Sequence, residues 1–249
     1  MKKVTLSAKI LAAATVGFSV ITLAPAANAA SLVPNIEGEV KLLNNGACLT
    51  NAANCIDTSL LGYTIESLDY KDGFGKSLLF ADDRNTANTY TQGSFEIKFL
   101  AEDEGTNPAL HQNWFRPVAV DENGKPLENG RLEVGLFEFV FDKVVNGLNL
   151  SFFDVETSGF SGVIKVNGIA VNNLLPGGPD SNLQYITLDD VKTLQIQLGQ
   201  PGVFPSVRTG DGVSLAVSVP EPGTIVSLGA LAVAGMFGVR KGKKVSQVG

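Results

Sequence analysis

Acidic side chains in adjacent pairs are the residues of this sequence whose types and spacing best suit chemistry. Two facing carboxylates at a defined separation, one of them with a raised pKa, hydrolyse glycosidic bonds. A sequence does not show whether carboxylates face one another, and runs of acids are mostly exposed to solvent. A secreted carbohydrate-active enzyme is therefore an alternative here and not the preferred interpretation. The acidic runs are Asp82-Asp83, Glu102-Asp103-Glu104, Asp121-Glu122 and Asp189-Asp190.

The sequence has few residues or motifs suited to nucleophilic catalysis or to cofactor binding. His111 is the only histidine, and no Gly-x-Ser-x-Gly elbow accompanies it. The sequence also lacks a His-Glu-x-x-His motif, a phosphate-binding glycine loop and a dinucleotide fingerprint. We therefore predict no catalytic residue, no cofactor and no enzymatic activity.

Calcium is the metal that the sequence could hold. Ca²⁺ takes six to eight oxygens from carboxylates, Asn side chains and backbone carbonyls in turns. Three short acidic turns have such oxygens, although none has the spacing of an EF-hand loop. Solvated turns are the preferred interpretation, and a structural calcium site is the alternative. The candidate ligands are Asp69, Asp72, Asp82, Asp83, Asp121 and Asn123.

Most phenylalanines occur at alternating positions typical of β-strands, but one aromatic pair does not. Trp114 and Phe115 precede Arg116 within the long polar segment 101–130. Exposed aromatic rings beside polar groups can stack on sugars, so these three residues are a candidate glycan-contacting patch. The alternative is a hidden strand over 114–120 that buries the indole at one end of the fold.

The two cysteines, Cys48 and Cys55, enclose a short segment. Because the ends of the chain indicate export, a disulfide is expected. A metal site would need further ligands nearby, and a redox pair would prefer Cys-x-x-Cys spacing.

Alternation of apolar and polar residues is the period that dominates between the two ends. Such alternation predicts half-buried strands of antiparallel sheets. Asn167-Gly168 between two apolar runs predicts a two-residue hairpin of type I′. A helical turn is expected near 189–191, and no helix of ten or more residues. We predict an all-β fold, a single antiparallel β-sandwich resembling a jelly roll. The expected strands cover 36–42, 63–68, 77–80, 95–99, 137–141, 148–155, 164–171, 183–187, 194–198 and 213–219.

The N-terminal segment has the pattern of a signal peptide. Three lysines precede an apolar run, and small residues end it. Ala27 and Ala29 fit the small-x-small rule, which predicts residues 1–29 as a signal peptide cleaved by signal peptidase.

The C-terminal segment has three parts in order. Pro220-Glu221-Pro222-Gly223 comes first, then the uncharged run 224–239, then the basic cluster 240–244. A run of 16 residues is short for a bilayer, which needs about 20. Even so, we expect 224–239 to be a single transmembrane helix with its basic end in the cytoplasm.

This order of parts resembles the PEP-CTERM sorting signal, here residues 219–244. The resemblance implies recognition at Pro220, Glu221, Pro222 and Gly223 by an exosortase-type membrane protease, followed by release to the cell surface. The tetrad Leu132–Gly135 (Leu-Glu-Val-Gly) is similar to the motif that names a PEP-CTERM subfamily.

Residues 30–218 remain as one expected β-sandwich ectodomain. Trimming both ends removes seven of the 19 basic residues but one of the 25 acidic ones, so its net charge is near −12. This charge argues against nucleic acid as a partner. The sequence thus predicts an exported surface or matrix protein without enzymatic activity, associated with adhesion or an exopolysaccharide. The second alternative is a plain membrane-anchored periplasmic protein.

Overall fold

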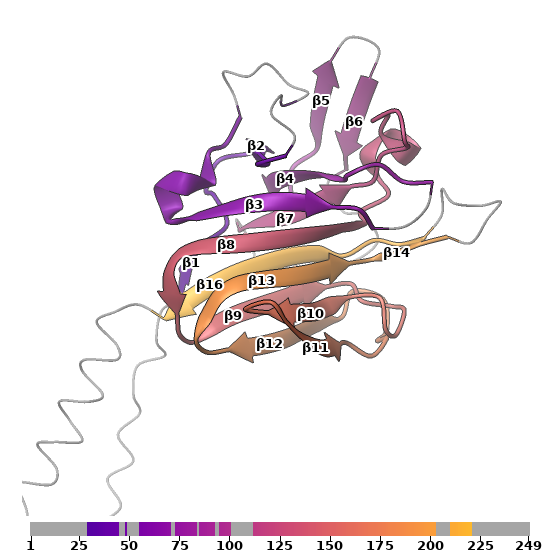
Figure 1. The fold of residues 1–249 in the computed structure, drawn as a ribbon. Helices are drawn as coiled ribbons and strands as arrows, with labels where there is room; N and C mark the ends of the chain where they lie inside the picture. Colours follow the sequence, from indigo (N-terminus) through magenta and orange to yellow (C-terminus); the bar gives the residue numbers. More distant parts are fainter. Residues whose placement is uncertain are drawn as a thin grey trace, which may run out of the picture.

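The structure is a computed structural model of the 249-residue chain. It describes residues 29–44, 48, 55–70, 73–83, 85–92, 95–100, 112–202 and 210–220. In these ranges the protein is all-β, and every pair of named strands is antiparallel. The predicted all-β antiparallel class is therefore confirmed (Figure 1).

The larger sheet has seven strands in the order β12-β9-β16-β7-β4-β2, and β1 also pairs with β16. Its strands come from both ends and from the middle of the described chain, so its pairings are mostly non-local. Its members are β1 (Ala29–Ser31), β2 (Gly38–Glu39), β4 (Leu78–Asp83), β7 (Asn113–Val118), β9 (Leu148–Phe153), β12 (Leu183–Leu188) and β16 (Ser214–Pro220).

The second sheet has five strands in the order β11-β10-β13-β8-β3. Its members are β3 (Tyr63–Leu68), β8 (Gly135–Val145), β10 (Gly162–Val166), β11 (Ile169–Leu174) and β13 (Val191–Leu198). Two small ladders and two 3-10 turns complete the elements: β5 (Asn88–Gln92) with β6 (Phe95–Phe99), β14 (Gln200–Pro201) with β15 (Gly210–Asp211), η2 (Thr58–Leu61) and η3 (Leu127–Gly130).

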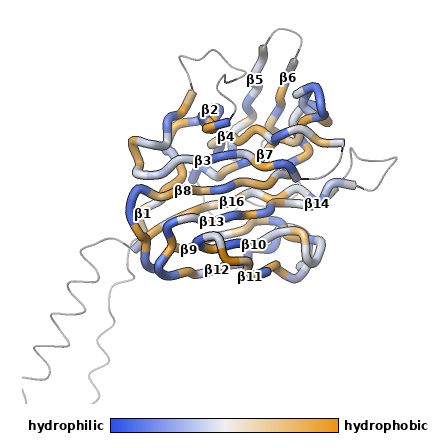
Figure 2. Tube along the Cα trace, viewed as in Figure 1, coloured by the Kyte–Doolittle hydropathy of each residue, from blue (hydrophilic) through white to orange (hydrophobic). Residues whose placement is uncertain are grey.

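One hydrophobic core lies between the two large sheets. Strand β8 shows why: Phe137, Phe139 and Phe141 alternate with less buried residues, so all three rings point to one face. Phe115 of the larger sheet meets Phe139 edge-on, with ring centroids 5.8 Å apart. Burying each such ring stabilises the fold by about 1.5–3 kcal/mol. Hydrophobic and hydrophilic residues alternate along the strands in Figure 2.

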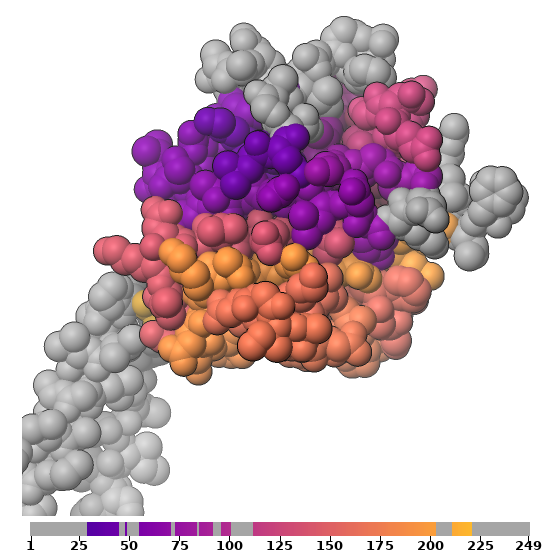
Figure 3. All heavy atoms as spheres, viewed as in Figure 1, coloured from indigo at the N-terminus to yellow at the C-terminus, as the bar shows by residue number. Residues whose placement is uncertain are grey.

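The N-terminal and C-terminal parts of the described chain form different regions of the surface. In the view of Figure 3, the first part of the chain covers one half of the described surface and the last part covers the other. Strand β8 lies between β3 and β13 and so joins the two halves within the five-stranded sheet.

The turn predictions had two outcomes. Asn167 and Gly168 connect β10 to β11 with φ of 51° and 77°, which confirms the type I′ hairpin. The helical turn near 189–191 is wrong. Asp189 and Asp190 form a tight connection between β12 and β13, in which Asp190 takes φ of 55°. Asp tolerates this left-handed region, so the chain reverses without a helix.

The expected signal peptide and transmembrane helix fall almost wholly outside the described residues. Ala27 belongs to the segment 1–28 and residues 224–239 to the segment 221–249, neither of which the structure describes. Within the ranges that it does describe, no helix is long and apolar enough to cross a bilayer.

Candidate functional site

The two ends of the described chain lie side by side. Strand β1 pairs with the end of β16 in the register Ala29↔Pro220, Ala30↔Val219 and Ser31↔Ser218. The backbone N–H of Leu32 continues the ladder by donating to the Val217 carbonyl, at 2.7 Å. The residue expected before the signal-peptidase cut and the first residue of the Pro-Glu-Pro motif are therefore neighbours across one ladder. Figure 1 shows β1 beside β16 at one edge of the fold.

Pro220 packs against the turn between β8 and β9. A Cβ on Gly147 would lie 2.9 Å from Cγ of Pro220, so only glycine leaves room there. Gly147 also has φ of +65°, and its N–H donates to the Asp189 carboxylate at 2.7 Å. The last residue of β16 is thus held by the backbone of a neighbouring hairpin. Glu221, Pro222 and Gly223 lie outside the described residues.

The candidate glycan patch is wrong. Trp114, Phe115 and Arg116 lie in strand β7, and their exposed fractions are 2%, 0% and 1%. A sugar ring cannot stack on side chains that solvent does not reach. The hidden strand predicted over 114–120 is confirmed, and the buried indole lies 5.9 Å from the ring of Phe153.

Arg116 instead joins two buried carboxylates. Its Nη1 donates to Asp82 Oδ2 at 3.0 Å, and its Nε donates to Glu133 Oε1 at 2.9 Å. The guanidinium lies 4.2 Å from the centroid of the Phe99 ring, which adds a cation–π contact. Ser214 Oγ donates to the other oxygen of Glu133 at 3.1 Å. The network connects β4, β7 and β16 through charge-assisted hydrogen bonds.

Burial and charge oppose one another in this network. Burial lowers the pKa of Arg116, but the combined attraction of Glu133 and Asp82 raises it by more than burial lowers it. The pKa is therefore above its usual value, and the guanidinium stays charged. Burial raises the pKa of the Asp82 carboxyl, and the attraction of Arg116 and the bonds from Asn88 and Tyr90 offset only part of that. One cation thus serves two carboxylates, an arrangement that suits a structural network.

The Leu132–Gly135 tetrad also has a structural role. Glu133 supplies a carboxylate to the Arg116 network, and the Val134 carbonyl accepts from Ser77 Oγ at 2.8 Å. A Cβ on Gly135 would lie 2.5 Å from the Phe137 ring. The subfamily resemblance itself stays a prediction.

The candidate calcium ligands that the structure describes are not gathered into one group. Both oxygens of Asp82 are engaged, Oδ2 by Arg116 and Oδ1 by Asn88 and Tyr90 at 2.7 and 3.1 Å. Asp82 is also fully buried, so a calcium role for it is wrong.

The other candidate ligands lie in separate places. Asp83 Oδ1 accepts from the backbone and side chain of Asn85, and Asp69 is exposed after β3. Asp121 Oδ1 accepts from the N–H groups of Asn123 and Lys125, both at 2.9 Å, and so closes its own turn. Asp72 lies outside the described residues, as does His111.

The disulfide is present. Cys48 and Cys55 are bonded, with their Cα atoms 6.0 Å apart. Ile56, the next residue, donates to the Glu39 carbonyl and bridges to Val40 of the β2 segment. The disulfide therefore lies one residue from the contact between Ile56 and the β2 segment, at the edge of the larger sheet.

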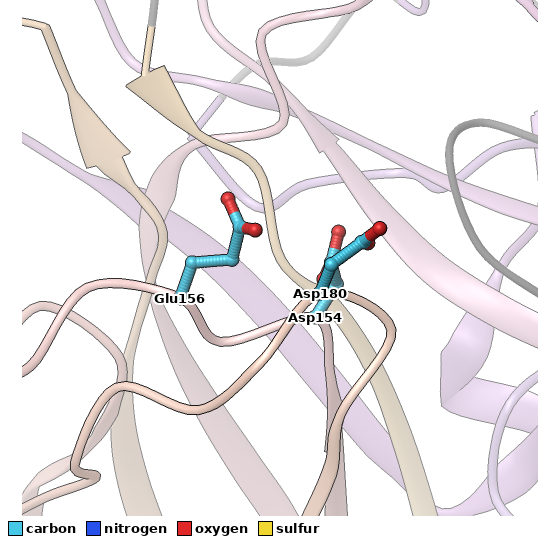
Figure 4. A group of neighbouring side chains, drawn as sticks. All are labelled: Asp154, Glu156 and Asp180. Atoms are coloured by element: carbon cyan, nitrogen blue, oxygen red, sulfur yellow. The ribbon is translucent and has the colours of Figure 1, made fainter.

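A different acidic group forms where the sequence analysis expected none. Asp154, Glu156 and Asp180 bring carboxylate oxygens within 4.8 Å of one another. Asp154 and Glu156 follow β9, and Asp180 precedes β12, so two connecting segments meet at one end of this strand pair. Figure 4 shows Asp154 and Asp180 close together, with Glu156 beside them on the same segment as Asp154. These acids are not adjacent in sequence, so a search for acidic runs passes over them.

Asp211 of β15 lies against the same turn. Its Oδ2 accepts from the N–H groups of Glu156 and Thr157, at 3.0 and 2.7 Å. Burial, together with repulsion from Asp154, raises the pKa of Asp211 above its usual range. The sequence gives one signal for this contact: Asp211 stands between two glycines, as a turn residue would.

Comparison with protein families identifies the end of the chain. The family model of the PEP-CTERM protein-sorting motif matches residues 218–244. No curated protein and no solved structure matches the chain. The resemblance of the C-terminal segment is thus confirmed, and the chain carries a PEP-CTERM sorting motif that begins within β16.

The motif defines the class of protein. It implies export, membrane anchoring before sorting, and processing by an exosortase-type protease. Position 218 pairs with Ser31, so the matched segment begins inside the folded sheet with no linker between them.

Proposed function

We propose that this protein is an exosortase-sorted component of the cell surface or extracellular matrix, without enzymatic activity. Its cargo domain is residues 30–218, a β-sandwich of jelly-roll type, and its role is in adhesion or association with exopolysaccharide. The sorting motif supports the delivery part of this proposal. The strongly negative ectodomain suits a protein that works outside the cell in contact with polysaccharide and divalent cations.

The proposed route has three steps. Signal peptidase cuts after Ala29, which releases the N-terminus on the far side of the inner membrane. Residues 224–239 then hold the chain in the bilayer, with the basic cluster 240–244 on the cytoplasmic side. The exosortase-type protease finally cuts within 220–223 and releases the folded domain.

The pairing of β1 with β16 is the observation that carries this route. A signal-peptidase cut after Ala29 removes one residue of β1 and leaves Ala30 and Ser31 paired with Val219 and Ser218. The sheet is therefore preserved by the first cut, and a second cut after Pro220 would leave β16 whole. Both cuts fall at the boundary of the folded domain.

Intact-mass measurement on the protein isolated from its native host tests the proposal. The expected mass corresponds to a chain that begins at Ala30 and ends within 220–223. A chain that begins at Ala30 but still ends at Gly249 would show a plain membrane-anchored protein. Deleting the exosortase gene of the host should convert the first mass into the second.

The polysaccharide association needs its own measurement. The released protein is mixed with exopolysaccharide from the same host and sedimented, with a neutral glucan as the control polymer. Co-sedimentation with the first and not with the second is expected. If the protein instead depolymerises either polymer, and a variant with one carboxylate replaced does not, the protein is a hydrolase.

A further inference from the structure

The acidic group after β9 has a second feature that an ordinary solvated cluster lacks. Asp211 is 8% exposed, and its Oδ1 is a buried oxygen with no hydrogen-bond partner in the described structure. Buried polar atoms in native proteins nearly always have a partner, and an ion or a water is a common one where no protein group serves. The carboxylate therefore has one oxygen fixed by the protein and one oxygen without a protein donor.

The hydrogen bonds to Asp211 Oδ2 fix the position of the carboxylate and therefore also that of Oδ1. Asp211 Oδ2 is held by the N–H groups of Glu156 and Thr157, so the carboxylate lies against the turn that carries Asp154 and Glu156. Its Oδ1 belongs to the same carboxylate, which lies near enough to Asp154 for the two to repel one another. Three carboxylates thus meet at one place, and a fourth, that of Asp211, lies against the turn that carries two of them.

The backbone around the group is rigid. Asp154 takes φ of +68° and donates from its N–H to the Asn182 carbonyl at 2.8 Å, and its Oδ1 accepts from Ser181 N at 2.8 Å. Asn182 Nδ2 donates to the Val155 carbonyl at 2.8 Å. A Cβ on Gly177 would lie 2.2 Å from the Glu156 carbonyl oxygen. The two turns are therefore closely packed, which fixes where their carboxylates stand.

We propose that Asp154, Glu156 and Asp180, with Asp211 against the turn that carries the first two, form a binding site for a divalent cation, and that the cation is Ca²⁺. All the donors are oxygens, which suits hard cations and not Zn²⁺, for which His and Cys are the usual ligands. Ca²⁺ accepts irregular sets of six to eight oxygens, whereas Mg²⁺ demands a near-ideal octahedron. Water completes the shell, because Glu156 and Asp180 are exposed.

The site would join β9, β12 and β15 from outside the core. An ion bound there draws together the segment after β9, the segment before β12 and Asp211 of β15. This inference does not depend on the sorting route, because it uses no residue of either end.

Calorimetric titration of Ca²⁺ into the full chain, purified in detergent and stripped with EDTA, tests the site. We expect one Ca²⁺ per chain, with a Kd of about 10⁻⁴–10⁻³ M, as in other extracellular modules. The variant Asp154→Asn/Asp180→Asn should weaken binding about tenfold or more. The control Glu122→Gln/Asp142→Asn removes the same charge from two exposed sites and should bind as the parent chain does.

Thermal unfolding separates a cation site from a merely structural cluster. In EDTA, the variant Asp154→Asn/Asp180→Asn should melt at the same temperature as the parent or higher, because it relieves repulsion between carboxylates. In Ca²⁺ it should melt lower than the parent, because a ligand stabilises only the chain that binds it. Absence of saturable binding up to about 10 mM Ca²⁺, ten times the weakest expected Kd, would overturn the proposal. Equal binding by the parent and this variant would also overturn it.

Discussion

Arg116 shows how a single residue can hold three strands together from inside the larger sheet. Its guanidinium is buried, yet it contacts carboxylates from β4 and from the segment before β8, as well as the ring of Phe99. A buried charge is tolerated only when it is paired and its hydrogen bonds are satisfied. The network therefore favours the register in which Arg116 faces both carboxylates.

Replacing this cation tests its contribution to stability. Arg116→Met keeps much of the apolar volume but leaves Asp82 and Glu133 without their cation, so we expect a loss of about 3–5 kcal/mol in the free energy of unfolding. The matched control is Arg131→Met, at a residue whose exposed side chain donates only to the Glu128 carbonyl. It should cost about 0.5 kcal/mol or less. Urea denaturation measures both, and equal losses would contradict the structural role.

Asp57 gives a pH dependence of known sign. Its carboxylate accepts from the hydroxyl and N–H of Ser59 and pairs with Lys41, which lowers the pKa of Asp57 from 3.8 to about 2. Because the folded-state pKa is below the unfolded-state value, the charge stabilises the fold above about pH 4. That contribution is lost as the pH falls towards 2.

The corresponding variant is Asp57→Ala. At pH 7 it should lose about 0.5–1 kcal/mol, a small value because the pair is exposed to solvent. The difference from the parent chain should shrink as the pH falls through 2, where the folded parent loses the charge. Asp57→Asn keeps an acceptor for Ser59 N–H and should lose less. A difference that is constant from pH 7 to pH 2 would contradict the assigned cause.

At the scale of elements, the turn between β8 and β9 sets the position of the end of β16. Gly147→Ala would place a methyl group 2.9 Å from Pro220 and would also strain a backbone with φ of +65°. Gly168→Ala is the matched control, because its φ is +77° and its Cβ would meet open space. Both variants should lose about 1 kcal/mol from backbone strain.

The two variants should differ at the paired ends. Gly147→Ala should displace Pro220 and speed amide hydrogen exchange at Leu32, whose N–H donates to Val217. Gly168→Ala should leave that exchange rate unchanged. If Gly147→Ala also leaves it unchanged, Pro220 does not depend on this turn.

Strand prediction succeeded where one face of the strand is buried. The predicted strand 63–68 coincides with β3, whose burial alternates residue by residue. Strand β5 was missed because Asn88–Gln92 is polar and pairs only with its neighbour β6. Its Tyr90 packs on Phe80 from another strand, and such packing is a property of the fold that local alternation does not report.

The acidic site was missed for a related reason. Asp154, Glu156 and Asp180 come together only because β9 pairs with β12 in the register Leu183↔Phe153. Of the adjacent acids that the structure describes, Asp82 belongs to a buried ion pair and the others lie in or beside turns. The sorting motif was predictable because its parts are contiguous, so no long-range pairing is needed to recognise it.

At the scale of the whole molecule, the end of the described chain is a part of the sheet. Strand β16 is bonded to β9 along most of its length and to β7 at Leu215. Removing it would expose the core between the sheets, since Leu215 and Val217 are buried there. The chain must therefore complete its last strand before the domain is stable.

The neighbouring positions of Ala30 and Val219 also mean that the domain is nearly a closed loop. Paired residues of an antiparallel ladder have Cα atoms about 4.5–5.5 Å apart, so a few Gly and Ser residues would join them. A circular permutant linked there and opened between Asn167 and Gly168 should fold with a melting temperature close to that of residues 30–219 in their natural order. Opening the same ring between Phe139 and Val140, inside β8, should abolish folding. The positions of the natural N- and C-termini of this domain would then be needed only for export and sorting. The fold itself would not depend on where the chain begins.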